Sequence, residues 1–112
     1  MTVDFMSSKY IVDIVDDYEN QSIKISLSFE DGTVIGNSSI SMMDVDSFIE
    51  YELEFLKEDA NEDVINQLSN FETLIEDKDT FYNLNSLEIE DDFRGDGFGR
   101  LLLDISLSHI RS

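Results

Sequence analysis

The sequence predicts an α+β domain, an antiparallel sheet combined with helices in the order β-β-β-α-α-β-α. The 112 residues are about the length of one domain, and Leu, Ile, Val and Phe make up about a third of them, enough for one core. Apolar residues alternate with a period of two up to about residue 43, and then recur at helical spacing. We therefore expect a single domain, residues 1–112, that carries an acidic two-helix insertion at residues 44–82.

The first half of the chain predicts three strands. Residues 9–15 are rich in β-branched and apolar side chains, and residues 23–29 alternate apolar with polar side chains, as in a half-buried strand. Asp31-Gly32 separates this second segment from residues 33–42. Because both central positions of a type I′ turn need a positive φ, which Asp-Gly tolerates, we expect a tight hairpin here.

Two helices are expected next. Asp44 or Asp46 can cap the first helix, which ends near Glu58 and has an apolar face formed by Phe48, Ile49, Leu53, Phe55 and Leu56. The second begins near Asn61, frays around residues 77–79, and carries Val64, Leu68, Phe71 and Ile75 at helical spacing.

The end of the chain predicts a strand, a glycine-rich loop and a helix. The strand covers residues 84–90, with Leu87 and Ile89 on one side. The helix places Phe98, Leu101, Leu102, Ile105 and His109 on one face. His109 is therefore interpreted as a packing or capping residue.

Composition excludes several function classes. The net charge of −19 opposes direct binding to nucleic acid and to anionic membranes, since both bind through Lys and Arg. With no Cys and one His, no thiolate or His-rich metal site is expected. Residues 1–8 lack the features of a signal peptide, and no apolar stretch approaches the ~20 residues that span a bilayer. We expect a cytoplasmic protein.

Residues 87–103 resemble motif A of the GNAT acyl-CoA N-acetyltransferases. That motif is an alternating strand, an aromatic residue, Arg-x-x-Gly-x-Gly, and a helix that opens with paired leucines. Phe93, Arg94, Gly97 and Gly99 match it, and the leucine pair is Leu102-Leu103. The resemblance implies a GNAT-like strand-loop-helix unit at residues 86–112.

In that family the loop holds the pyrophosphate of coenzyme A, and free N–H groups at a helix N-terminus favour phosphate. The resemblance thus implies that acetyl-CoA would bind here, and the positions it assigns to the cofactor are Arg94, Gly95, Gly97, Gly99 and Arg100. The last 19 residues carry three arginines and two aspartates, so this segment is locally basic.

Two departures from the family argue against catalysis. About 40 residues, 44–82, intervene before the motif strand, and the chain ends about one helix after the loop. We therefore expect neither the splayed strand that admits the cofactor nor a later tyrosine acid, and we assign no catalytic residue. Glu88 and Glu90 are interpreted as solvent-facing strand residues.

Four carboxylates recur at every fourth position of the first predicted helix: Asp46, Glu50, Glu54 and Glu58. We call them the acidic column; it would span about 18 Å at 1.5 Å per residue. Such a column can occupy an Arg-rich groove in place of nucleic-acid phosphates. Phe48, Tyr51 and Phe55 would add apolar contacts with the partner. The column is also compatible with an ordinary solvated helix face.

Three hypotheses follow. The first is an acidic inhibitor of a basic, nucleic-acid-binding protein, similar in composition to phage proteins that block CRISPR nucleases. The second is a short acetyl-CoA-dependent N-acetyltransferase. The third is a structural subunit that forms homo-oligomers through an exposed edge strand.

Overall fold

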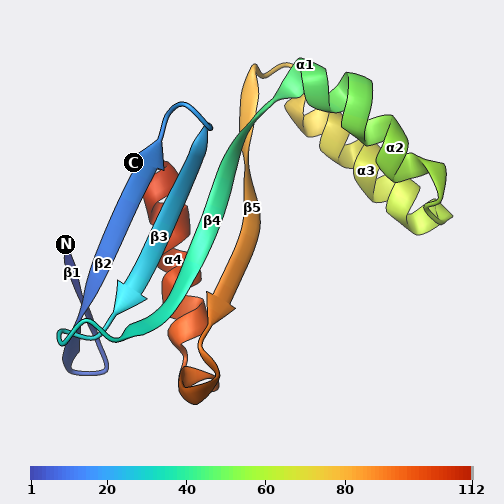
Figure 1. Ribbon diagram of the computed structural model, residues 1–112. Coiled ribbons are helices and arrows are strands. Elements are labelled where there is room, and N and C mark those ends of the chain that lie inside the picture. The colour runs from blue at the N-terminus through green and yellow to red at the C-terminus, as the bar shows by residue number, and fades with distance from the viewer. Residues whose placement is uncertain (112) are drawn as a thin grey trace. The chain divides into compact units, whose positions relative to one another are not determined.

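The computed structural model describes residues 1–111 and contains a five-stranded antiparallel sheet together with helices (Figure 1). The α+β class is confirmed. The strands are β1 (Thr2–Phe5), β2 (Ser8–Asp17), β3 (Ser22–Ser28), β4 (Val34–Asp44) and β5 (Thr80–Ile89). They follow one another in the sheet in chain order.

The observed order is β-β-β-β-α-α-β-α. It differs from the predicted order by one additional strand, β1, which was not predicted. β1 is only four residues long and pairs with β2 through a two-residue turn at Met6-Ser7, where both residues have positive φ. These dihedrals fit a type I′ turn, although neither residue is Asn, Asp or Gly. The turn therefore carries no composition signal.

The predicted hairpin at Asp31-Gly32 is present, but its turn is not type I′. Only Gly32 has a positive φ, at 95°, and the Gly32 N–H donates to the Phe29 carbonyl at 3.0 Å. The register then shifts between Leu27 and Ser28. This is a three-residue loop with an adjoining bulge, in which the Asp31 carboxylate accepts a hydrogen bond from the Thr33 N–H at 2.9 Å.

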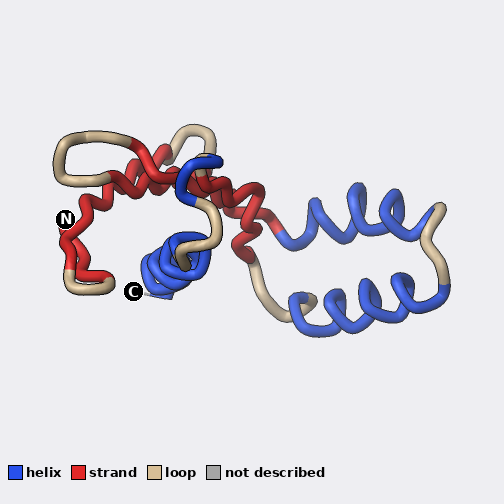
Figure 2. Tube along the Cα trace, turned by 90° about the horizontal axis from the view of Figure 1, so that it is seen from below, coloured by secondary structure: helices blue, strands red, loops and turns tan. Residues whose placement is uncertain are grey.

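The chain forms two compact units. Unit 1 comprises residues 1–41 and 84–112, and unit 2 comprises residues 42–83. In unit 1, α4 (Phe98–Arg111) lies against one face of the sheet (Figure 2). The core between them contains Tyr10, Val12, Ile25, Leu27, Ile35, Ile40, Phe98 and Leu102.

Unit 2 contains a pair of helical segments, together with the end of β4 and the beginning of β5. The first comprises α1 (Val45–Ser47), a π-helical segment (Phe48–Leu53) and α2 (Glu54–Glu58). The second is α3 (Glu62–Ile75). Asp44, one of the two predicted alternatives, caps the first segment, because its side chain accepts a hydrogen bond from the Ser47 N–H at 2.9 Å. The side chain of Asn61, near which the second helix is predicted to begin, caps α3 by accepting a hydrogen bond from the Val64 N–H at 2.9 Å. The core of unit 2 contains Val45, Phe48, Leu53 and Ile75.

No helix among residues 1–111 has the length and apolar character that crossing a membrane requires.

Candidate functional site

The acidic column lies on the first helical segment of unit 2, and all four of its side chains are exposed. In an α-helix of 3.6 residues per turn, a four-residue step overshoots a full turn by about 40°. The π-helical segment between Phe48 and Leu53 has a wider turn, which reduces that drift. The four carboxylates therefore share one side of the segment.

The charge of the column is not neutralised within the described part of unit 2. Lys57 pairs with Glu72 of α3 at 3.3 Å, and Lys78 lies 3.9 Å from Asp77. No ion pair among residues 1–111 involves a member of the column. These carboxylates are therefore available to an external cation.

Asp44 lies directly before the column and caps the first helical segment. Hydrogen bonding from Ser47 lowers the pKa of Asp44 below its usual 3.8. An ionised cap next to the positive end of a helix stabilises the first turn.

Two of the three aromatic residues predicted to contact a partner are exposed. Tyr51 is 70% exposed and Phe55 is 73% exposed, and they are four residues apart on the first segment. Phe48 is only 8% exposed, and its ring packs 5.1 Å from that of Phe81 and 5.8 Å from that of Phe71. The Phe48 side chain therefore belongs to the core of unit 2 and offers little exposed surface to a partner.

The π-helical segment explains the difference between Phe48 and Phe55. Regular α-helical spacing predicts that both side chains lie on one apolar face. In the structure, buried Phe48 and Leu53 are five residues apart, which matches the i→i+5 pattern of a π-helix. This change of phase leaves Phe55 and Leu56 facing solvent.

In unit 1, the glycine-rich loop connects β5 to α4. A 3-10 turn (Asp91–Phe93) comes first, and Gly95 and Gly97 then have φ near 88° and 89°. A Cβ on Gly97 would lie 3.2 Å from the Phe5 ring, whereas one on Gly95 would meet nothing within 4 Å. Gly99 is inside the first turn of α4. The backbone of this loop thus needs glycine at positions 95 and 97.

Both arginines assigned to the cofactor already have acidic neighbours. The Arg94 guanidinium lies 3.1 Å from an Asp91 carboxylate oxygen, and its Nε donates to the Ile89 carbonyl at 3.0 Å. Arg100 Nε lies 3.7 Å from Asp104, one helical turn further on. With Asp92 and Asp96 also on the loop, its net charge is less favourable for a pyrophosphate than the count of arginines suggests.

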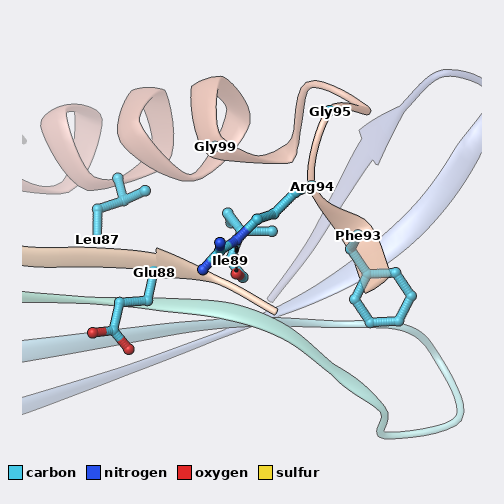
Figure 3. A pocket seen from close by; sticks show the side chains of 7 residues that line it. All are labelled: Leu87, Glu88, Ile89, Phe93, Arg94, Gly95 and Gly99. Atoms are coloured by element: carbon cyan, nitrogen blue, oxygen red, sulfur yellow. Dashed lines mark hydrogen bonds between the residues drawn. The ribbon is translucent and has the colours of Figure 1, made fainter. Parts of the chain in front are cut away.

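A pocket of about 360 Å³ opens between the end of β5 and the first turn of α4 (Figure 3). Leu87 points toward α4, whereas Glu88 points to the opposite side of the strand. The lining residues are Leu87, Glu88, Ile89, Phe93, Arg94, Gly95 and Gly99. Three of the five positions assigned to the cofactor, Arg94, Gly95 and Gly99, line this pocket; Gly97 and Arg100 do not.

Two polar contacts of α4 were not predicted. Ser106 is buried, its hydroxyl lies 2.8 Å from that of Ser38 on β4, and it also donates to the Leu102 carbonyl. His109 is half-buried, as expected of a packing residue, and its Nε2 lies 3.3 Å from Asp16 on β2. His109 also lines a second pocket, of about 440 Å³, with residues of β1 and β2. Ser106 is polar and does not belong to the helical pattern of apolar residues, so that pattern could not predict its burial.

No protein-family model, curated protein or solved structure matches this chain. No group of three or more His, Cys, Asp or Glu residues within residues 1–111 has the geometry of a metal site.

Proposed function

We propose that this chain is a small acidic interaction protein that inhibits a basic, nucleic-acid-binding protein, of the kind phages use against CRISPR nucleases and other host defences. One observation carries the proposal. Four exposed carboxylates without an internal ion pair share one helical segment with two exposed aromatic side chains.

Electrostatics supports competition with nucleic acid. A groove that binds phosphates through Lys and Arg attracts any regular array of negative charge, and a net charge of −19 adds long-range steering. The column supplies Asp46, Glu50, Glu54 and Glu58. Binding through these groups should weaken as salt screens them.

The aromatic side chains add apolar contact surface to the electrostatic attraction of the column. Tyr51 and Phe55 would each lose exposed apolar surface against a partner, and aromatic faces also attract Arg and Lys through cation–π contacts. The proposed contact surface therefore combines the acidic column with Tyr51 and Phe55.

Displacement of DNA tests the proposal. A fluorescein-labelled duplex is bound to each of a panel of purified basic DNA-binding proteins, CRISPR nucleases among them, and the chain is titrated in while anisotropy is recorded. We expect saturable displacement from at least one target. Changing all four column residues to Lys should raise the concentration of the chain that displaces half of the duplex by at least tenfold.

A matched variant controls for net charge. Reversing Asp4, Asp13, Glu30 and Asp92 to Lys changes the charge by the same amount, and these exposed residues all lie in unit 1. It should retain displacement to within a few-fold. If both variants lost displacement of the duplex equally, the net charge of the chain, and not the column, would be the cause of inhibition.

The pocket beside the glycine-rich loop favours a second candidate function, binding of acetyl-CoA by a short N-acetyltransferase. The pocket has an apolar wall for the pantetheine arm, and the first turn of α4 presents backbone N–H groups. Acetyl-CoA should then raise the melting temperature saturably, since a ligand bound only by the native state stabilises it. Arg100→Glu should abolish that shift, and Arg111→Glu, at the far end of α4, should preserve it.

A further inference from the structure

The outer edge of β5 differs from that of β1. Both strands end the sheet, but β1 has four residues and β5 has ten. Proteins protect exposed edges with short strands, Lys or Pro, and residues 84–89 contain neither Lys nor Pro. Thus β5 is a long edge without the usual protection.

Two contacts show which backbone groups of β5 face outward. The Glu90 N–H donates to the Ile35 carbonyl of β4 at 2.8 Å, and the Glu88 carbonyl faces Gly36 of β4. Because backbone groups alternate sides along a strand, those of Leu87 and Ile89 point away from β4. Arg94 Nε donates to the Ile89 carbonyl, which is consistent with this direction.

The pocket lies directly beneath this edge. Leu87, Ile89, Phe93 and Gly99 give it an apolar lining on the side of α4, whereas Glu88 projects on the opposite side of β5 (Figure 3). An additional strand beside β5 would place alternate side chains in these two environments. Its inward side chain would enter the pocket, and its outward neighbour would lie near Glu88.

We propose that the outer edge of β5 binds an extended peptide segment of a partner protein, in which apolar and basic residues alternate. The apolar residue fills the pocket of about 360 Å³, and the flanking Lys or Arg residues approach Glu88 and Asp92, since Asp91 already pairs with Arg94. Main-chain bonds to Leu87 supply affinity, and the alternate side chains supply specificity.

Charge favours a basic partner over a second copy of this chain. Two copies joined through β5 would bring together two molecules of charge −19, with Glu88, Asp91 and Asp92 of both near the joint. Repulsion of this kind opposes association, whereas a cationic peptide is attracted. This surface belongs to unit 1 and is separate from the acidic column of unit 2, so the inference goes beyond the proposed function.

Titration with two defined peptides tests the inference. The first is acetyl-Thr-Lys-Val-Lys-Val-Lys-Thr-amide, and the second replaces both Val residues with Ser, which keeps the charge. Binding to the ¹⁵N-labelled full chain is followed by amide chemical shifts. We expect the Val peptide to bind at least tenfold more tightly, with the largest shifts between residues 86 and 99.

Two variants locate the site. Leu87→Pro removes the outward N–H, and Leu87→Ala removes the same side chain but keeps the N–H. Leu87→Pro should bind the Val peptide at least fivefold more weakly than Leu87→Ala. Gly99→Leu, where a Cβ would make only an ordinary 3.8 Å contact with Ile89, fills the pocket and should abolish the preference for Val over Ser.

Each contrary result would overturn the inference. These results are equal affinity for the two peptides, no binding of either, equal affinity of the two Leu87 variants, and dimerisation of the chain without peptide. The variant with a Lys-substituted acidic column should retain the preference for Val over Ser. Loss of this preference in that variant would mean that the peptide binds at the acidic column.

Discussion

Gly36 and Gly99, which both approach Ile89, differ in what an added methyl group would meet. A Cβ on Gly36 would lie 2.6 Å from Ile89 Cδ1 and 3.2 Å from Ile89 Cα, in the backbone of β5. A Cβ on Gly99 would lie 3.8 Å from Ile89 Cγ1, an ordinary contact. Only Gly36 is therefore required for close approach of two strands.

Replacing each by Ala should have opposite effects on stability. Gly36→Ala should lower the free energy of unfolding by about 1–3 kcal/mol, as overpacking does. Gly99→Ala should raise it by about 0.5–1 kcal/mol, because Gly99 is inside a helix. Urea unfolding followed by circular dichroism checks both, and a stabilising Gly36→Ala would contradict the described pairing of β4 with β5.

Phe48 and Phe55 provide a matched pair on one helical segment. Phe48→Ala should lower the free energy of unfolding by about 3–5 kcal/mol, because it removes a buried ring that contacts Phe71 and Phe81. Phe55→Ala should change stability by less than about 0.5 kcal/mol, because that side chain is largely exposed. Urea unfolding checks both variants. Similar decreases in the free energy of unfolding for the two variants would show that Phe55 is buried.

At the scale of elements, the cap of the first helical segment links stability to pH. The hydrogen bond from Ser47 lowers the pKa of Asp44 in the folded protein below its usual 3.8. The ionised cap therefore stabilises the fold above the unfolded-state pKa, and this contribution is lost as pH falls through the lower folded-state pKa.

Asp44→Ala should thus destabilise the protein at pH 7, and the difference from the unchanged chain should disappear as pH falls well below 3.8. Asp44→Asn, which can also cap a helix, should retain stability at pH 7 and show a weaker dependence on pH. Thermal melts between pH 3 and 7 check this. A difference that stays constant over this range would exclude an ionised cap.

Elements with a strong local signal were predicted, and elements set by tertiary packing were not. The cap at Asp44, the start of α3 at Asn61 and the hairpin turn at Asp31 depend on side chains that accept hydrogen bonds from the adjacent backbone. β1 is too short to show a pattern. The π-helical segment has no composition signature, so the regular spacing assumed for Phe48 and Phe55 gave the wrong face.

The same distinction applies to the candidate sites. Exposure of the acidic column follows from charge, because burying an unpaired carboxylate is costly. The pocket at Leu87 and Gly99 brings together two elements, and its shape depends on packing that no periodicity describes. The contacts of Arg94 with Asp91 and with the Ile89 carbonyl likewise depend on how the loop folds back on the end of β5, which no sequence pattern describes.

For the whole molecule, the dominant quantity is the net charge of −19. Self-repulsion of this size destabilises a compact chain, and salt screens it with a Debye length of about 10 Å at 0.1 M. We expect the melting temperature to rise by several degrees between 10 mM and 500 mM NaCl. The variants with four acids reversed to Lys should show a smaller rise, and a melting temperature that falls with salt would mean that attractive ion pairs dominate.

The order of the strands also has a kinetic consequence. Since β1, β2 and β3 each pair with the next strand in the chain, these three pairings close short loops, which lowers the entropic cost of forming them early. The contact of β5 with β4 must instead close over about 35 residues. We therefore expect the folding nucleus to lie in the β2-β3-β4 meander, with Ile25 and Leu27 at its centre, and β5 to join the sheet after the rate-limiting step.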